Sequence, residues 1–111
     1  MQNPEMTEKA LGLLGFAARA RRTVVGVSLI CAALSHGGAG KTPLIVLEAA
    51  DSSENSHKRI SDRTAYYGVP CYRLECDTSR LARAVGKRDG AVAAVGVTDP
   101  GLAGAIRAIF Q

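Results

Sequence analysis

The chain has 111 residues, of which 47% are apolar and 22% charged, and its formal net charge is +4. That length suits one domain with a hydrophobic core, and the composition excludes both a disordered chain and a membrane protein. No apolar run approaches the roughly 18 to 20 residues that cross a bilayer, so we expect no membrane partner. Ten arginines stand against four lysines, and because arginine binds phosphate bidentately, this charge favours an anionic partner.

The cysteines bear on compartment and on metal binding. Cys31, Cys71 and Cys76 are odd in number and show no CxxC spacing. Residues 1–5 lack the basic start and apolar core of a signal peptide. We therefore predict reduced thiols, two of them buried, in a cytoplasmic protein. We expect neither a metal site nor another cofactor.

The first third of the chain predicts two helices around a short strand. Asn3-Pro4 is a typical helix start, and apolar residues at helical spacing continue this helix to about Ala20. The β-branched segment 23–25 predicts a small strand. A second helix starts at Gly26 or Ser28 and ends at the glycine pair 37–38.

The middle of the chain predicts a strand, a helix and a further strand. The continuous apolar run 43–47 is typical of a strand buried on both faces. Residues 51–54 can form a capping box, with Asp51 as the cap, and open a helix that ends at Gly68. The next strand covers residues 69–74.

The last part repeats this alternation. Asp77-Thr78 caps a short helix that ends at Gly86, residues 91–97 form another strand buried on both faces, and Asp99-Pro100 begins the final helix. Nine alternating elements predict one α/β domain over residues 1–111, with helices on both faces of a small parallel or mixed sheet of about four strands.

The segment Gly40-Lys41-Thr42 resembles the end of a nucleotide-binding P-loop. That motif requires a glycine five residues before Gly40, where this chain has Ser35. The motif also follows a strand and opens a helix, whereas this segment is predicted to follow a helix and to enter a strand after Pro43. We therefore expect a flexible turn here and no nucleotide hydrolysis.

No catalytic constellation is evident. His36 and His57 have no serine, cysteine or carboxylate nearby in a nucleophile–base arrangement, so both are predicted to be solvated. Glu48 and Asp51 flank the exit of a buried strand, where α/β folds place functional groups. Without a partner acid or base, Asp51 is more simply a helix cap. We expect no enzyme.

Basic side chains form three clusters, at residues 19–22, 58–63 and 80–88. The loop from Gly86 to Gly90 is the most suggestive, because two glycines let the backbone approach a ligand beside Lys87 and Arg88. Only five residues are aromatic and none is tryptophan. Base stacking of the kind used by sheet-surface and barrel RNA-binding domains is therefore disfavoured.

Several segments in one register resemble the bacterial YlxQ/YbxF-type proteins of the kink-turn-binding ribosomal protein superfamily, which includes the archaeal protein of box C/D guide ribonucleoproteins. The matching segments are Leu11-Gly12-Leu13-Leu14-Gly15-Phe16-Ala17, Arg19–Gly26, Leu44–Asn55, Tyr66-Tyr67-Gly68-Val69-Pro70, Leu81–Lys87 and Val95–Ala103.

The resemblance implies a three-layer α/β/α sandwich and non-catalytic binding of sharply bent RNA, in association with the ribosome. In the family, the start of the second helix, the exit of the second strand and the loop before the last strand grip the RNA. Carried over by position, the implied contacts are Arg22, Gly26, Val27, Ser28, Leu29, Ala32, Glu48, Asp51, Val85, Gly86, Lys87 and Arg88.

One segment departs from the family pattern. Archaeal and eukaryotic members open the second helix with Gly-x-Asn-Glu followed by a lysine, whereas the matching positions here include Ser28, Leu29 and Ala32. Base-specific readout then loses its donors and acceptors, while backbone amides and Arg22 can still hold phosphate. The alternative is a protein-interaction module that kept the fold and lost kink-turn recognition, with the apolar start of this helix as the partner surface.

Overall fold

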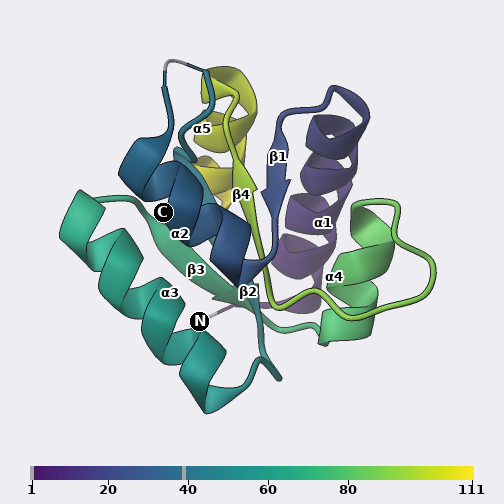
Figure 1. The fold of residues 1–111 in the computed structure, drawn as a ribbon. Coiled ribbons are helices and arrows are strands. Elements are labelled where there is room, and N and C mark those ends of the chain that lie inside the picture. The colour runs from purple at the N-terminus through teal and green to yellow at the C-terminus, as the bar shows by residue number, and fades with distance from the viewer. Residues whose placement is uncertain (1, 39) are drawn as a thin grey trace.

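The computed structural model describes residues 2–38 and 40–111. Met1 and Ala39 lie outside the described residues. Met1 opens the segment that is predicted to lack a signal peptide, and Ala39 directly precedes the Gly-Lys-Thr segment. Helices and strands alternate along the chain (Figure 1). They are α1 (Pro4–Arg19), β1 (Thr23–Val25), α2 (Val27–His36), β2 (Ile45–Ala49), α3 (Glu54–Tyr67), β3 (Cys71–Leu74), α4 (Thr78–Ala84), β4 (Ala94–Val97) and α5 (Pro100–Phe110).

The four strands form one mixed sheet in the order β1-β4-β2-β3. β2 and β3 are parallel, whereas β4 runs antiparallel to both of its neighbours, β1 and β2. The two central strands are buried along their whole length, as their continuous apolar sequences predict.

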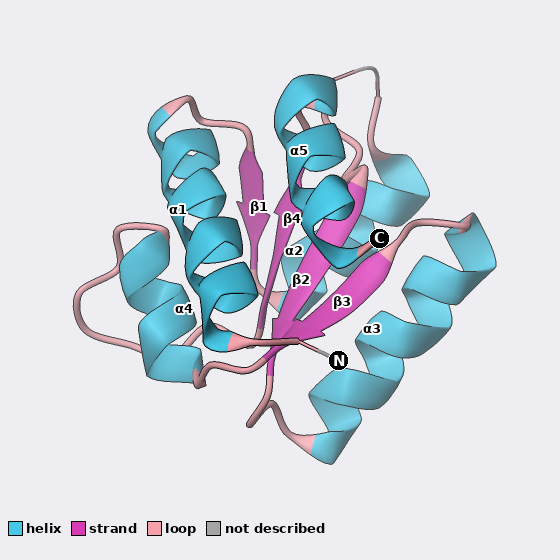
Figure 2. Cartoon of the chain, turned by 180° about the vertical axis from the view of Figure 1, so that it is seen from behind, coloured by secondary structure: helices cyan, strands magenta, loops and turns pink. Residues whose placement is uncertain are grey.

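Helices cover both faces of this sheet (Figure 2). One core lies between the sheet and α1, α4 and α5, around Leu14, Leu47 and Ile106. The other lies between the sheet and the pair α2–α3, around Ile30 and Ile60. The predicted three-layer α/β/α sandwich is therefore confirmed. Within the described ranges, no helix has the length and apolarity needed to cross a membrane.

Three of the predicted strands have other boundaries in the structure. β3 begins at Cys71 rather than at Val69, and β2 ends at Ala49 rather than at Leu47. β2 begins at Ile45 rather than at Pro43, because proline cannot donate to a sheet. β4 begins at Ala94 rather than at Ala91, because the amide of Val92 donates to the Thr78 carbonyl oxygen at 3.1 Å, away from the sheet.

Side-chain caps fix the starts of four helices. Asn3, Ser53, Asp77 and Asp99 each accept a hydrogen bond from a first-turn amide of α1, α3, α4 and α5 respectively. The predicted cap of α3 at Asp51 is wrong, because Ser53 takes that role. Asp51 Oδ1 instead accepts from the Thr78 amide of α4 at 2.7 Å, so it links the exit of β2 to another helix.

Candidate functional site

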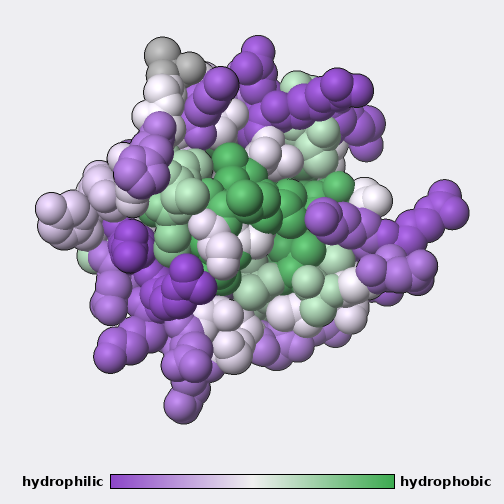
Figure 3. Space-filling model, viewed as in Figure 1, coloured by the Kyte–Doolittle hydropathy of each residue, from purple (hydrophilic) through white to green (hydrophobic). Residues whose placement is uncertain are grey.

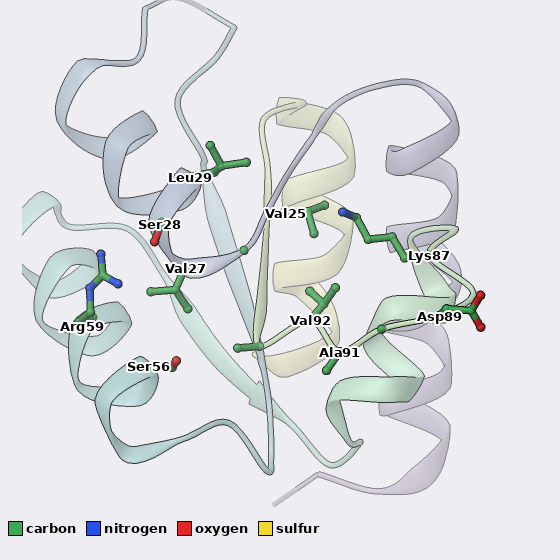
Figure 4. A pocket seen from close by; sticks show the side chains of 13 residues that line it. Val25, Val27, Ser28, Leu29, Ser56, Arg59, Lys87, Asp89, Ala91 and Val92 are labelled. Atoms are coloured by element: carbon green, nitrogen blue, oxygen red, sulfur yellow. The ribbon is translucent and has the colours of Figure 1, made fainter.

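Three segments that are far apart in sequence border one open hollow of about 550 Å³ (Figure 4). They are the start of α2, the loop that leads into β4, and the first turns of α3. The lining residues are Val25, Gly26, Val27, Ser28, Leu29, Ser56, Arg59, Lys87, Asp89, Gly90, Ala91, Val92 and Ala93.

The start of α2 gives the hollow unpaired backbone donors. Gly26 has φ 99° and ψ 146°, a conformation close to glycine-only space, and α2 has no side-chain cap. The first helical hydrogen bond runs from the Ile30 amide to the Gly26 carbonyl oxygen at 3.0 Å. The preceding amides, at residues 27–29, therefore have no acceptor within the helix and add to its positive dipole end.

Two cations stand at the rim of the hollow. Arg59 extends from α3 towards Ser28, and Lys87 extends from the loop towards Val25, while the Asp89 carboxylate points away (Figure 4). Neither Arg59 nor Lys87 makes a salt bridge within residues 2–38 and 40–111. Their charges and the α2 dipole end therefore act together on whatever occupies the hollow.

Glu48 is buried beneath this face, with 2% of its surface exposed. His57 Nδ1 lies 2.9 Å from both of its carboxylate oxygens, and the Ser52 hydroxyl donates to Oε2. The prediction that His57 has no neighbouring carboxylate is therefore wrong. Because Glu48 has almost no open surface, its structural role is to tie β2 to the start of α3.

The other predicted site residues lie outside the hollow. Arg22 lies at the opposite end of β1, where its carbonyl oxygen accepts from the Thr98 amide at 2.9 Å. Ala32 is exposed further along α2, and Arg88 is exposed in the loop. Val85 and Gly86 line a separate hollow of about 220 Å³ together with Arg19 and Arg83.

Sequence reasoning missed Arg59, Ser56 and residues 91–93 as neighbours of the start of α2. The basic cluster at residues 58–63 was a signal for Arg59. The sequence contained nothing that placed this helix beside α2 rather than elsewhere on the sheet.

The thiols are free, but they are less buried than predicted: Cys31 is buried, whereas Cys71 and Cys76 are half-buried. Burial raises the pKa of Cys71 to about 11, with a further contribution from the Glu48 carboxylate and an opposing one from the Thr64 hydroxyl. Burial likewise raises the pKa of Cys76 to about 11, and the Asp77 carboxylate adds to it. Among the described residues, no group of three or more His, Cys, Asp or Glu could hold a metal ion.

Two solved structures share the α/β/α sandwich architecture of this chain. A Giardia lamblia 15.5kD RNA binding protein aligns with a TM-score of 0.80 over 98% of this chain and 88% of its own, at 17% identity. A Bacillus halodurans protein with unknown function aligns with a TM-score of 0.78 over 91% and 95%, at 29% identity.

Curated sequences identify the family more closely. RNA-binding protein YlxQ of Bacillus subtilis is 37% identical over 91 residues, which cover 82% of this chain and 84% of that protein. RNA-binding protein YlxQ of Enterococcus faecium is 35% identical over 80 residues, which cover 72% and 73%. No protein-family model matches the chain. The chain belongs to the YlxQ family, as the resemblance of its segments indicated.

Proposed function

We propose that this protein binds structured RNA without catalysis, that it takes a kink-turn-like bend in the hollow, and that it acts in the cytoplasm in association with the ribosome. The observation that carries the proposal is the juxtaposition of the uncapped α2 start with Arg59 and Lys87, all facing one hollow. The names of the YlxQ relatives support RNA as the anion.

Contacts to the RNA backbone would dominate this binding. Side chains that line the α2 edge are Val27, Ser28 and Leu29, of which only Ser28 has a hydrogen-bonding group. Phosphate contacts position a nucleic acid but carry no sequence information. The protein should therefore recognise the shape of the RNA more than its bases.

A gel-shift titration with a kink-turn RNA and an unbent duplex of matched composition tests the proposal. The kink-turn should bind more tightly, and two or three phosphate contacts should give a log–log salt slope of roughly −2 to −3. Equal affinity for both RNAs would contradict recognition of the bend. The absence of any shift at low salt would contradict RNA binding altogether.

A second candidate function is protein interaction through the same face. Leu29 is 62% exposed at the start of α2, and Figure 3 shows an apolar area over this part of the molecule, framed by hydrophilic side chains. Exposed apolar patches mark partner surfaces. Stable self-association of the RNA-free protein, lost in Leu29→Ser, would favour this function.

A further inference from the structure

We infer that the RNA surface continues from the hollow along the groove between α2 and α3 to Tyr66 and Tyr67, where an unpaired base of a single-stranded flank stacks. This inference rests on the proposed function and names a second feature of the RNA: a single-stranded segment beside the bend.

The two helices lie side by side and define a path (Figure 1). At one end, Ser28 of α2 lines the hollow together with Ser56 and Arg59 of α3. At the other end, the Tyr67 hydroxyl donates to Ser35 Oγ at 3.2 Å. The hollow and the tyrosines are therefore the two ends of one helix–helix groove.

Arg59, Arg63 and Tyr66 follow each other at the i, i+4, i+7 spacing, which places them on one side of α3. From Arg59 the other two lie about 6 Å and 10 Å further along the helix axis. Arg63, like Arg59, makes no salt bridge in the part of the chain that the structure describes. An RNA strand that leaves the hollow thus passes two cations that make no salt bridge among the described residues before it reaches the first tyrosine ring.

The tyrosines stand in a second hollow of about 390 Å³, lined by Asp62, Arg63, Tyr66 and Tyr67. The two rings meet edge to face, with centroids 4.9 Å apart and an interplanar angle of 81°. Tyr66 is 79% exposed, so its ring is held by its neighbour and still open to solvent. Proteins that stack nucleic-acid bases of any identity use such an exposed ring beside a positively charged groove that follows the nucleic-acid backbone.

Charge and polarity favour a base as the occupant of this second hollow. The Asp62 carboxylate would repel a phosphate there, whereas an uncharged base meets no such repulsion. Arg63 remains available for the adjoining phosphate. The α2 side of the groove is small or polar, with Ser28, Ala32 and Ser35 at the same helical spacing, which gives an apolar protein partner little area to bury.

Fluorescence anisotropy tests the inference with a blunt kink-turn RNA and with two tailed forms of it, which carry a short unpaired tail on one strand or on the other. We expect the tail on one strand to raise the affinity of the wild-type protein. Tyr66→Ala should remove this gain, roughly five- to a hundredfold for one stacked base, and should leave the blunt RNA unaffected. Tyr66→Phe keeps the ring and should retain the gain.

Arg63→Ala should lower the salt slope for the tailed RNA only. Lys58→Ala, which removes a cation from another side of α3, is the matched control. It should change the salt slope by the same amount for the blunt and for the tailed RNA. If the tail adds no affinity, or if Tyr66→Ala weakens both RNAs equally, the inference is wrong while the hollow can still bind the bend. If neither RNA binds, the proposed function and the inference both fail. Loss of self-association in Tyr66→Ala, with RNA affinity unchanged, would assign the tyrosines to a protein contact instead.

Discussion

His57 Nδ1 lies 2.9 Å from both carboxylate oxygens of Glu48, a residue with only 2% of its surface exposed to solvent. Glu48 belongs to β2, in the middle of the sheet, and His57 to the first turns of α3. The contact therefore fixes the helix end that presents Ser56 and Arg59 to the hollow.

Removal of His57 should destabilise the fold. His57→Ala leaves a buried carboxylate with the Ser52 hydroxyl as its remaining partner, which should cost about 1–3 kcal/mol. The partly exposed imidazole keeps this below the cost of breaking a fully buried pair. Urea unfolding measures the change. In the double variant Glu48→Leu/His57→Ala the buried charge is gone, so stability should recover in part; a double variant weaker than His57→Ala would contradict this account.

The backbone at Gly26 should not tolerate a side chain. Gly26→Ala places a Cβ at φ 99°, which should cost about 1–3 kcal/mol although no described heavy atom beyond the two neighbouring residues lies within 4 Å of the new methyl group. Gly12 is the matched control, because its Cβ position is also open but it lies within α1. Gly12→Ala should therefore stabilise the protein by roughly 0.5–1 kcal/mol. Thermal unfolding of both variants checks the contrast, and equal shifts would refute it.

Gly96 should be intolerant for a different reason, which is steric. A Cβ there would lie 2.9 Å from Pro43 Cβ and 3.0 Å from Pro43 Cγ. Gly96→Ala should therefore cost roughly 1–3 kcal/mol, in the range of overpacked cores. A double-mutant cycle with Pro43→Gly checks the cause, since removal of the proline ring should relieve part of the cost. Purely additive effects would show that Pro43 is not the obstacle.

Alkaline pH should weaken the protein partly through Cys71 and Cys76. Their folded-state pKa values of about 11 exceed the ordinary thiol pKa of 9.0. An unfolded chain therefore loses these protons first, so the stability present below pH 9 is lost as the pH rises from about 9 to 11. Melting temperatures of the wild type and of the double variant Cys71→Ala/Cys76→Ala measure this effect. They are compared between pH 8 and 11, a range that spans both pKa values. The variant should show the shallower decline; parallel curves would contradict it.

RNA affinity should depend on the cations at the hollow more than on Arg22. Lys87→Ala and Arg59→Ala each remove one charge beside the α2 start, so each should reduce the magnitude of the log–log salt slope by about one. Arg22 lies about 13 Å along β1 from Gly26, and Arg22→Ala should change the slope less. Gel shifts at several salt concentrations compare the three variants. If all three leave affinity unchanged, the RNA site lies elsewhere on the molecule.

Local patterns predicted most of the fold. The continuous apolar runs gave the two buried central strands, and Asn3, Asp77 and Asp99 gave the starts of three helices, because strand burial and capping depend on neighbouring residues. The non-local relationships were out of reach. Glu48 directly follows the apolar run 43–47 and is as buried as the rest of β2, and its partner His57 is nine residues away on another element. Arg59 and Lys87 border the same hollow only because α3 packs beside α2.

The uncapped start of α2 also links ligand binding to the folding equilibrium. The other four helices have side-chain caps, whereas no side chain in the described part of the chain accepts a hydrogen bond from the first amides of α2. Any anion bound there completes this helix only in the folded chain, so it shifts the unfolding equilibrium by RT ln(1 + [L]/Kd). Saturation with a ligand should then slow hydrogen exchange most at the amides of residues 27–29, and the melting temperature should rise with ligand concentration.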